Sequence, residues 1–162
     1  GMPVEAGTPG QLWIRSESNT TGYWRRTDLT RDLVHGEWVR MSDMLVEEDD
    51  GVFRHVGRAD DLFKVDAKFV SPVQVEGVIH EHPAVAEVAV VGRADDQGLM
   101  RVVAVLVASD GADTEAAEQE IRHAVAHALG PYSAPNVIEW RDELPRLASG
   151  KVARRILRDS TG

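Results

Sequence analysis

Residues 85–107 read VAEVAVVGRADDQGLMRVVAVLV. Two runs rich in β-branched side chains, Val85–Val91 and Val102–Val107, stand on either side of the turn-prone residues Asp95–Gly98. β-Branched residues pack well on a pleated sheet, and aspartate and glycine favour turns. The stretch therefore predicts two paired central strands.

Helical patterns flank these strands on both sides. Before them, Pro72 suits the first turn of a helix that runs through Val75, Val78 and Ile79 and stops at His82-Pro83. After them, an amphipathic segment begins at Thr114 and ends at Gly130-Pro131. Its apolar face is expected to hold Ala117, Ile121, Ala124, Val125, Ala128 and Leu129. With a strand at 136–140 and a short basic helix at 152–158, the pattern predicts an α+β fold.

The first third of the chain has a different pattern. Strand-like runs at 11–15, 37–41, 44–46 and 52–56 are separated by turn residues, so this part is expected to be all-β. The acidic run at 47–51 is a possible divalent-cation site, but Asp-Gly between two alternating strands favours a hairpin turn. The polar stretch at 57–61 is the expected domain boundary.

Composition narrows the class of protein. The chain has 162 residues, a formal net charge of −9 and no cysteine, which excludes disulfides and thiolate metal sites. An acidic chain is a poor binder of nucleic acid, which requires a surplus of lysine and arginine. No apolar run is long enough to span a membrane, and the first residues do not resemble a secretory signal. We expect a cytoplasmic protein without nucleic-acid or membrane partners.

The loop at 144–151, LPRLASGK, is a candidate for chemistry. Its proline and glycine shape an exposed loop that presents Lys151 just before a helix. An ammonium on a flexible stem suits negative oxygens that meet in a transition state, although a solvated surface lysine remains the alternative. A Walker phosphate loop is excluded, because Pro145 and Val152 stand where glycine and Ser/Thr are needed.

Other polar residues are less specific. Asp43 is expected at the end of a strand, where a carboxylate can accept hydrogen bonds from ribose hydroxyls, or simply form a turn. His123 and His127 have the i,i+4 spacing of zinc ligands but point away from the apolar face and lack an evident third ligand. We therefore expect no metal site. No Gly-x-Ser-x-Gly elbow is present.

Six short motifs, taken in order, resemble the adenylate-forming superfamily. They are residues 10–13, 22–24, 38–43, 57–61, 71–76 and 144–151. Around 64–72 and 82–95 the chain looks most like benzoate and other aryl-CoA ligases.

The resemblance implies roles for several residues. Lys151 matches the lysine that bridges the substrate carboxylate and nucleotide oxygens, and Asp43 the aspartate that holds the ribose hydroxyls. Arg58 matches the arginine that helps to fix the nucleotide, and Asp60 the hinge aspartate. Residues 64–70, including Lys64, Val65, Asp66, Ala67 and Lys68, match the loop that reaches the pantetheine tunnel of coenzyme A.

The resemblance also implies an organisation. Residues 1–57 would be the β-rich tail of a large N-terminal domain, 58–62 a hinge, and 63–162 a C-terminal α+β lid with a three-stranded sheet, helices and a β-hairpin. ATP (releasing AMP) and coenzyme A would be substrates, with Mg²⁺ accompanying ATP and nothing bound tightly to this chain. The family's phosphate loop and acyl pocket precede this region, so we expect a fragment that is inactive alone. Its partners would be the missing domain and an aromatic or other carboxylate, with a homodimer possible through exposed strand edges.

The chain departs from the family pattern in three places. Ala67 replaces a usual glycine, so that its methyl is expected to crowd the pantetheine path or to forbid a positive φ. Met41-Ser42 replaces Thr-Gly, and Ser133 replaces a common lysine. An alternative is therefore a free-standing, non-catalytic binding or regulatory module.

Overall fold

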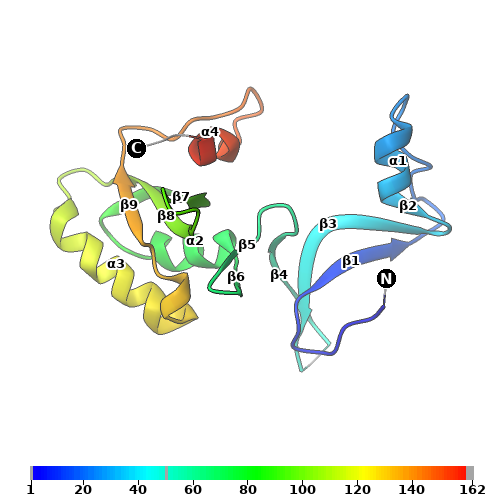
Figure 1. The fold of residues 1–162 in the computed structure, drawn as a ribbon, viewed down its shortest axis with the longest axis horizontal. Helices are drawn as coiled ribbons and strands as arrows, with labels where there is room; N and C mark the ends of the chain where they lie inside the picture. The colour runs from blue at the N-terminus through cyan, green and yellow to red at the C-terminus, as the bar shows by residue number, and fades with distance from the viewer. Residues whose placement is uncertain (1, 50, 160–162) are drawn as a thin grey trace. The chain divides into compact units, whose positions relative to one another are not determined.

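The computed structural model describes residues 2–49 and 51–159. It divides into two compact units, one ending at Asp60 and the other beginning at Asp61. In Figure 1 the first unit runs in colour from blue to cyan and the second from green to red.

The first unit is an antiparallel sheet centred on one long strand. That strand, β3 (Trp38–Glu47), pairs along one side with β1 (Gly10–Arg15). Along its other side it pairs with the short β2 (Val34–His35) near its start and with β4 (Phe53–Arg58) near its end. A seven-residue helix, α1 (Thr27–Leu33), precedes β2.

Three expectations for this unit need correction. It is not all-β, because α1 is present. This helix spans only seven residues and carries two apolar side chains, Leu29 and Leu33, which is too short a pattern to predict a helix from sequence. Residues 37–41 and 44–46 do not form two strands, since pairing continues through Asp43, which lies opposite Arg58. Finally, Gly57 and Arg58 belong to β4 and not to a turn.

The hairpin between β3 and β4 is present. The Gly51 amide donates to the Glu48 carbonyl at 2.9 Å, and the Glu48 amide donates to the Val52 carbonyl at 2.9 Å. Of the acidic run at 47–51, Asp50 lies outside the described residues.

The second unit is the predicted α+β domain. Its sheet has the order β7 (Val85–Ala94), β8 (Met100–Ala108), β9 (Val137–Trp140), with β7 and β8 antiparallel and β8 and β9 parallel. A separate hairpin, β5 (Phe63–Val65) and β6 (Lys68–Val70), precedes them. Its helices are α2 (Pro72–His80), α3 (Thr114–Leu129), the 3₁₀ turn η1 (Pro131–Ser133) and α4 (Arg154–Asp159).

Local chemistry explains where the helices begin and end. Ser71 caps α2 by accepting from the Gln74 amide at 3.3 Å, with Pro72 in the first turn. Asp113 caps α3 in the same way, and Gly130, at φ +94°, ends it. Helix α4 begins at Arg154, two residues later than expected, because Val152 forms a bridge with Arg146.

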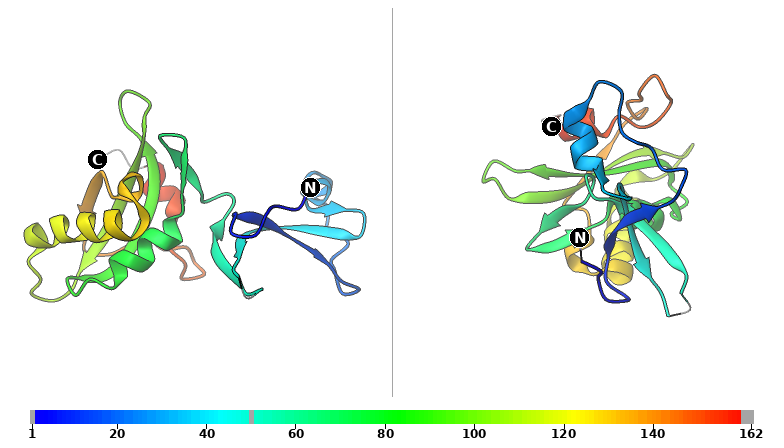
Figure 2. Two further views of the ribbon diagram at one scale, coloured as in Figure 1. Left: turned by 90° about the horizontal axis from the view of Figure 1, so that it is seen from below. Right: turned by 90° about the vertical axis from the view of Figure 1, so that its right-hand side faces the viewer.

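The sheet of the second unit is covered on both faces (Figure 2). Alternate residues of β7 and β8, such as Val90 and Leu106, pack with Ile79 of α2 and Ile121 of α3. The residues between them, such as Ala89 and Val105, pack on the other face with Leu144 and Leu157. On α3, Ala124 and Ala128 are exposed, so its buried stripe is narrower than expected.

Within the described residues, no helix has both the length and the apolar character needed to cross a membrane.

Candidate functional site

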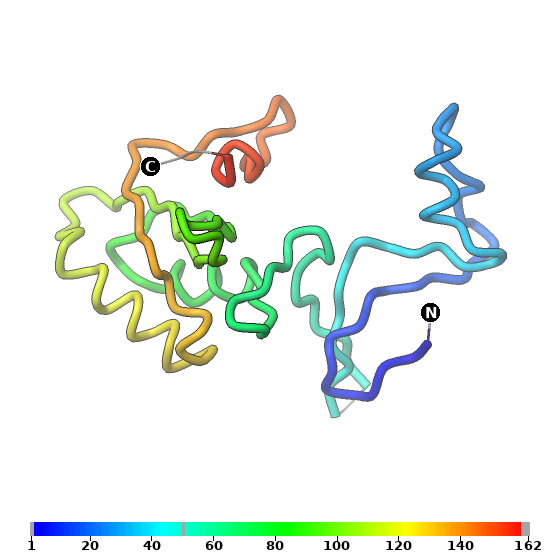
Figure 3. The backbone as a smooth tube through the Cα atoms, viewed as in Figure 1, coloured from blue at the N-terminus to red at the C-terminus, as the bar shows by residue number. Residues whose placement is uncertain are grey.

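The Lys151 segment, residues 144–152, is a turn held by backbone hydrogen bonds on one face of the second unit. Its Leu144 end is buried, and the bridge between Arg146 and Val152 closes the turn. Within it, the Leu147 amide donates to the Lys151 carbonyl at 2.8 Å, and the Gly150 amide to the Leu147 carbonyl at 2.9 Å. Gly150 has φ +82°, a conformation that glycine adopts without strain. The orange-to-red trace in Figure 3 follows this turn into α4.

Lys151 differs from the other cations around it. Arg146 pairs with Glu87, Arg154 with Glu76, Arg155 with Asp159, and Arg158 with Asp61. Within residues 144–159, all of which the structure describes, the exposed Lys151 is the one cation that no carboxylate neutralises. Its ammonium is therefore available to an anion from outside.

The first unit gathers a polar cluster on β3 and β4. Asp43 lies within β3, not at its end as expected, and its Oδ1 is 3.1 Å from His55 Nε2 on β4. Arg58 is the cross-strand partner of Asp43. The Arg58 guanidinium contacts Asp60 with two hydrogen bonds, of 3.0 and 3.1 Å.

His55 was not expected in this cluster. Its side chain and that of Asp43 are both partly exposed, at 46% and 36%. The sequence does not predict this contact, because the pairing of β3 with β4 includes a register shift between Met44 and Leu45. Such a shift changes which residues of the two strands lie opposite each other.

The β5–β6 hairpin carries two lysines, and each lies over an aromatic ring. Lys64 Nζ is 4.6 Å from the centre of the Phe69 ring, and Lys68 Nζ is 4.7 Å from that of Tyr132. Such cation–π contacts order the aliphatic part of each lysine side chain, while its ammonium group keeps access to water. Tyr132, on η1, is a further residue that sequence reasoning did not single out.

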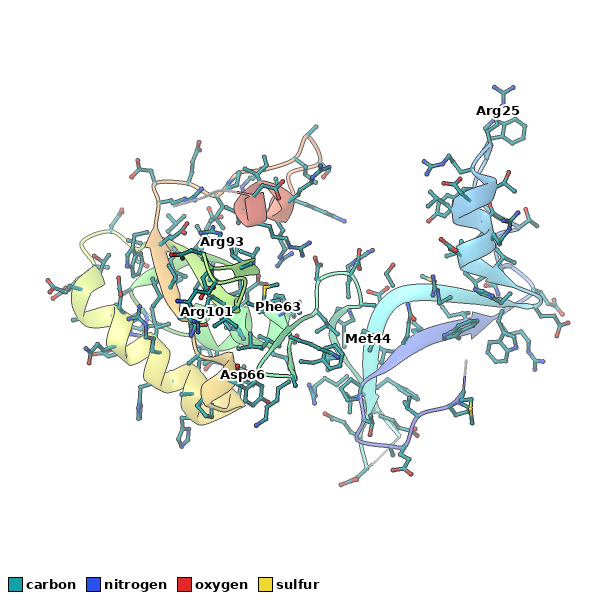
Figure 4. The ribbon with its side chains drawn as sticks, viewed as in Figure 1. Arg25, Met44, Phe63, Asp66, Arg93 and Arg101 are labelled. Carbon is teal, nitrogen blue, oxygen red and sulfur yellow. The ribbon has the colours of Figure 1, made fainter. Side chains whose placement is uncertain are left out.

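The two-residue turn of the hairpin has positive φ at both positions, +48° for Asp66 and +63° for Ala67. The expectation that alanine would forbid a positive φ at position 67 is therefore wrong. The strand pairing on either side of a two-residue turn imposes positive φ on both turn residues. This backbone conformation is strained in an alanine, so it costs conformational free energy at position 67. Figure 4 labels Asp66 at this turn and Phe63 on β5.

Ser133 is buried in η1, with only 4% of its surface exposed. Its hydroxyl lies 3.5 Å from the Leu129 carbonyl. The serine at this position therefore serves local packing.

The hairpin and the Lys151 turn lie on opposite faces of the central sheet. Val65 and Val70 of the hairpin belong to the core on the α2 and α3 face. Leu144 and Val152, which flank Lys151, pack on the other face.

A network of charges supports the Lys151 face. Arg93 on β7, labelled in Figure 4, donates to Glu139 on β9 and, at 2.7 Å, to the Leu157 carbonyl of α4. Burial raises the pKa of the Glu139 carboxyl, but the Arg93 and Arg141 guanidiniums outweigh it and hold that pKa below its ordinary value. Glu139 is therefore an ionised structural anchor.

Metal ligands do not gather in the described residues. Within 2–49 and 51–159, no three His, Asp or Glu side chains are placed to hold an ion. His123 and His127 are exposed on α3.

Comparisons with known proteins agree with this arrangement. Residues 74–151 match the family model of the AMP-binding enzyme C-terminal domain. The chain is 36% identical over 163 residues to the 4-hydroxybenzoate–CoA/benzoate–CoA ligase of Rhodopseudomonas palustris, covering 99% of this chain and 30% of that enzyme. It is also 36% identical to a long-chain-fatty-acid–CoA ligase of Yersinia pestis, covering 98% of this chain and 28% of that enzyme.

Among solved structures, an anthranilate CoA ligase in complex with anthranoyl-AMP aligns with a TM-score of 0.90 and 36% identity, over 98% of this chain and 31% of that one. The chain thus spans about 30% of the length of the curated relatives that it matches.

Proposed function

Because this chain belongs to the AMP-binding enzyme C-terminal domain family, we propose that it is the lysine-bearing part of an ATP-dependent carboxylate–CoA ligase. In the first step a carboxylate oxygen attacks the α-phosphorus of ATP, the bond to the bridging oxygen breaks, and pyrophosphate leaves. In the second step the sulfur of coenzyme A, having lost its proton, attacks the acyl carbon. The bond from that carbon to AMP then breaks.

The state of Lys151 carries the proposal. Lys151 is exposed on a hydrogen-bonded turn, and among the cations of residues 144–159 it alone has no carboxylate partner. During adenylation its ammonium would bridge the attacking carboxylate and the phosphate oxygens, where negative charge gathers in the transition state. A positioned cation lowers the barrier because it stabilises that charge more than it stabilises the ground state.

Asp43 and Arg58 are proposed to hold the nucleotide. The Asp43 carboxylate would accept hydrogen bonds from the two ribose hydroxyls, and Arg58, opposite it across the strand pair, would lie beside the nucleotide. His55 fixes one oxygen of Asp43, which supports a defined orientation of this carboxylate. Mg²⁺ would arrive on the ATP phosphates.

The hairpin at 64–68 is proposed to serve the second step, at the entry of pantetheine. Its placement on the sheet face opposite Lys151 supports a sequential mechanism, in which each face is presented in turn. The division of the chain directly after Asp60 supports a hinge at that residue. The substrate is proposed to be an aromatic or other carboxylate, because the relatives' names include both aromatic-acid and long-chain-fatty-acid ligases.

A fusion protein tests this function. The chain would replace the matching 30% of the Rhodopseudomonas palustris ligase, and ATP–pyrophosphate exchange would be measured with benzoate and a panel of carboxylates. We expect exchange in the fusion and a loss of about 100-fold in Lys151→Ala. Arg155→Ala, an exposed cation on the same segment, is the matched control and should retain exchange.

The opposite result has a clear meaning. A folded fusion without exchange, or one in which Lys151→Ala has no effect, would contradict the proposal. It would favour a binding or regulatory module that has kept the fold.

A further inference from the structure

A partly buried ion pair joins the two helices that cover opposite faces of the second unit's sheet. Glu76 on α2 accepts two hydrogen bonds from Arg154 Nη2 on α4, at 2.6 Å to Oε1 and 2.7 Å to Oε2. The side chains are only 15% and 28% exposed. The same Glu76 Oε1 accepts from the Val90 amide of β7 at 2.8 Å.

The geometry places this pair around the edge of the sheet. Among the strands of the described residues, β7 pairs with β8 alone, so its other side is an edge where the Val90 amide has no strand partner among them. Glu76 covers that amide from the α2 side, and Arg154 reaches the Glu76 carboxylate from the α4 side. The contact, here called the Glu76–Arg154 clasp, thus ties a six-residue helix to the core.

The clasp lies close to Lys151 along the chain. Only three peptide units separate Lys151 from Arg154, about 11 Å at full extension. Between them, the Ala153 amide donates to the Pro145 carbonyl at 2.7 Å, which links the start of α4 to the Lys151 turn. Movement of Arg154 would therefore be transmitted to the turn.

We propose that Glu76 and Arg154 are positioning residues for Lys151, and that the clasp holds the turn at 144–153 in the geometry that adenylation needs. The proposal rests on the function proposed above for Lys151. A helix of six residues is too short to be stable by itself, so its place depends on such anchors. Leu157, which is fully buried, and the Arg158–Asp61 pair hold its far end, whereas the clasp holds the end next to Lys151.

The first test uses the chain itself and amide hydrogen exchange. In Glu76→Gln, which keeps an acceptor for the Val90 amide, and in Arg154→Met, which keeps the Glu76 carboxylate, the amides of Leu147, Gly150 and Ala153 should exchange about tenfold faster. The α3 amides of Ile121 and Val125 should be unchanged. The matched control is Arg155→Gln, whose ion pair on the same helix is exposed.

A combined variant tests whether the two residues act as one unit. Glu76→Gln together with Arg154→Met should accelerate the turn amides no more than either change alone, because both remove the same ion pair. Unchanged turn exchange in the single variants would overturn the proposal. Equal acceleration in α3 would overturn it too, since the clasp would then stabilise the unit in general.

The second test separates the two half-reactions in the fusion protein. Glu76→Gln should slow ATP–pyrophosphate exchange about tenfold, while thioester formation from supplied acyl-adenylate should change by less than about twofold. Equal loss in both steps would count against positioning of Lys151. If the unaltered fusion is inactive, the proposed function fails, yet the exchange measurement on the chain still decides whether the clasp orders the turn.

Discussion

Ala67 holds a backbone conformation that an L-residue with a Cβ rarely adopts. Its φ of +63° costs an alanine about 1 kcal/mol or more. The neighbouring Asp66, at +48°, tolerates this region better because a short polar side chain can hydrogen-bond locally. Backbone strain in this hairpin is therefore concentrated at one methyl group.

Replacing that alanine tests the strain. Ala67→Gly should stabilise the second unit by about 0.5 kcal/mol. Removing the strain stabilises the folded state by about 1–1.5 kcal/mol. This gain exceeds the roughly 0.4–1 kcal/mol by which the greater conformational entropy of glycine stabilises the unfolded state. Urea unfolding at constant m-value is the measurement. Ala86→Gly, at an exposed strand position, is the control and should destabilise. A less stable Ala67→Gly protein would show that the methyl is not strained.

At the scale of elements, one glycine permits the hairpin to pack on the sheet. A Cβ at Gly92 would lie 2.5 Å from Phe63 Cγ and 2.9 Å from Met100 Sδ. The Phe63 side chain of β5 therefore approaches the backbone of β7 more closely than a Cβ at position 92 would allow. The position of the hairpin proposed to reach coenzyme A depends on this contact.

Gly92→Ala should destabilise the second unit by about 1–3 kcal/mol, because the added methyl overpacks the contact with Phe63. Thermal or urea unfolding gives the value. The control is Gly77→Ala in the middle of α2, where a Cβ meets nothing within 4 Å. There the same change should stabilise by about 0.5–1 kcal/mol. Destabilisation of both variants to the same extent would argue against the packing explanation.

The Arg93–Glu139–Arg141 network joins strands β7 and β9 with α4, and it predicts a pH dependence. Because the pKa of Glu139 is lower in the folded state than in the unfolded state, its contribution is present at neutral pH. That contribution is lost as the pH falls through the folded pKa, below the ordinary carboxyl range of about 4.

Glu139→Gln should therefore be less stable than the parent at neutral pH, with the difference narrowing as the pH is lowered below about 4. Urea midpoints between neutral and acid pH measure this. Glu81→Gln, at an exposed position, should leave the pH profile unchanged. A difference that persists undiminished at the most acid pH would contradict the assignment.

At the scale of the whole molecule, the two units differ in their apolar cores. Of the buried apolar residues in the described chain, only Val39, Val46 and Val56 belong to the first unit. The second unit has a core on each face of its sheet. In the first unit Trp24 and Phe53 are 87% and 60% exposed. Large apolar side chains left exposed are typical of a surface that contacts other protein.

Residues 61–162 expressed alone should therefore fold cooperatively, whereas amides of residues 1–60 in the complete chain should exchange much faster than those of β8. A single urea transition for the shorter protein and exchange measurements on the full chain are the tests. Absence of a cooperative transition would contradict this division of stability.

A homodimer stays a prediction, which sedimentation showing only monomer would contradict.

Much of the fold was determined by the sequence alone. The strands around Asp95–Gly98, the helices at 72–80 and 114–129 and the α+β class follow from apolar periodicity, caps and turn residues, which act over a few neighbouring positions. The family was evident from the order of its motifs. Helix α1 was missed because its seven residues hold only two apolar side chains, Leu29 and Leu33, which is too short a periodic pattern to predict a helix.

Other features were decided only by the tertiary structure. Glu76 meets Arg154 across 78 positions of sequence, and Asp43 meets His55 through a register shift between strands. No local pattern encodes such pairs, because each depends on how separate elements pack against one sheet. The availability of Lys151 was decided in the same way, since it became evident only when the fold had paired every neighbouring arginine with a carboxylate.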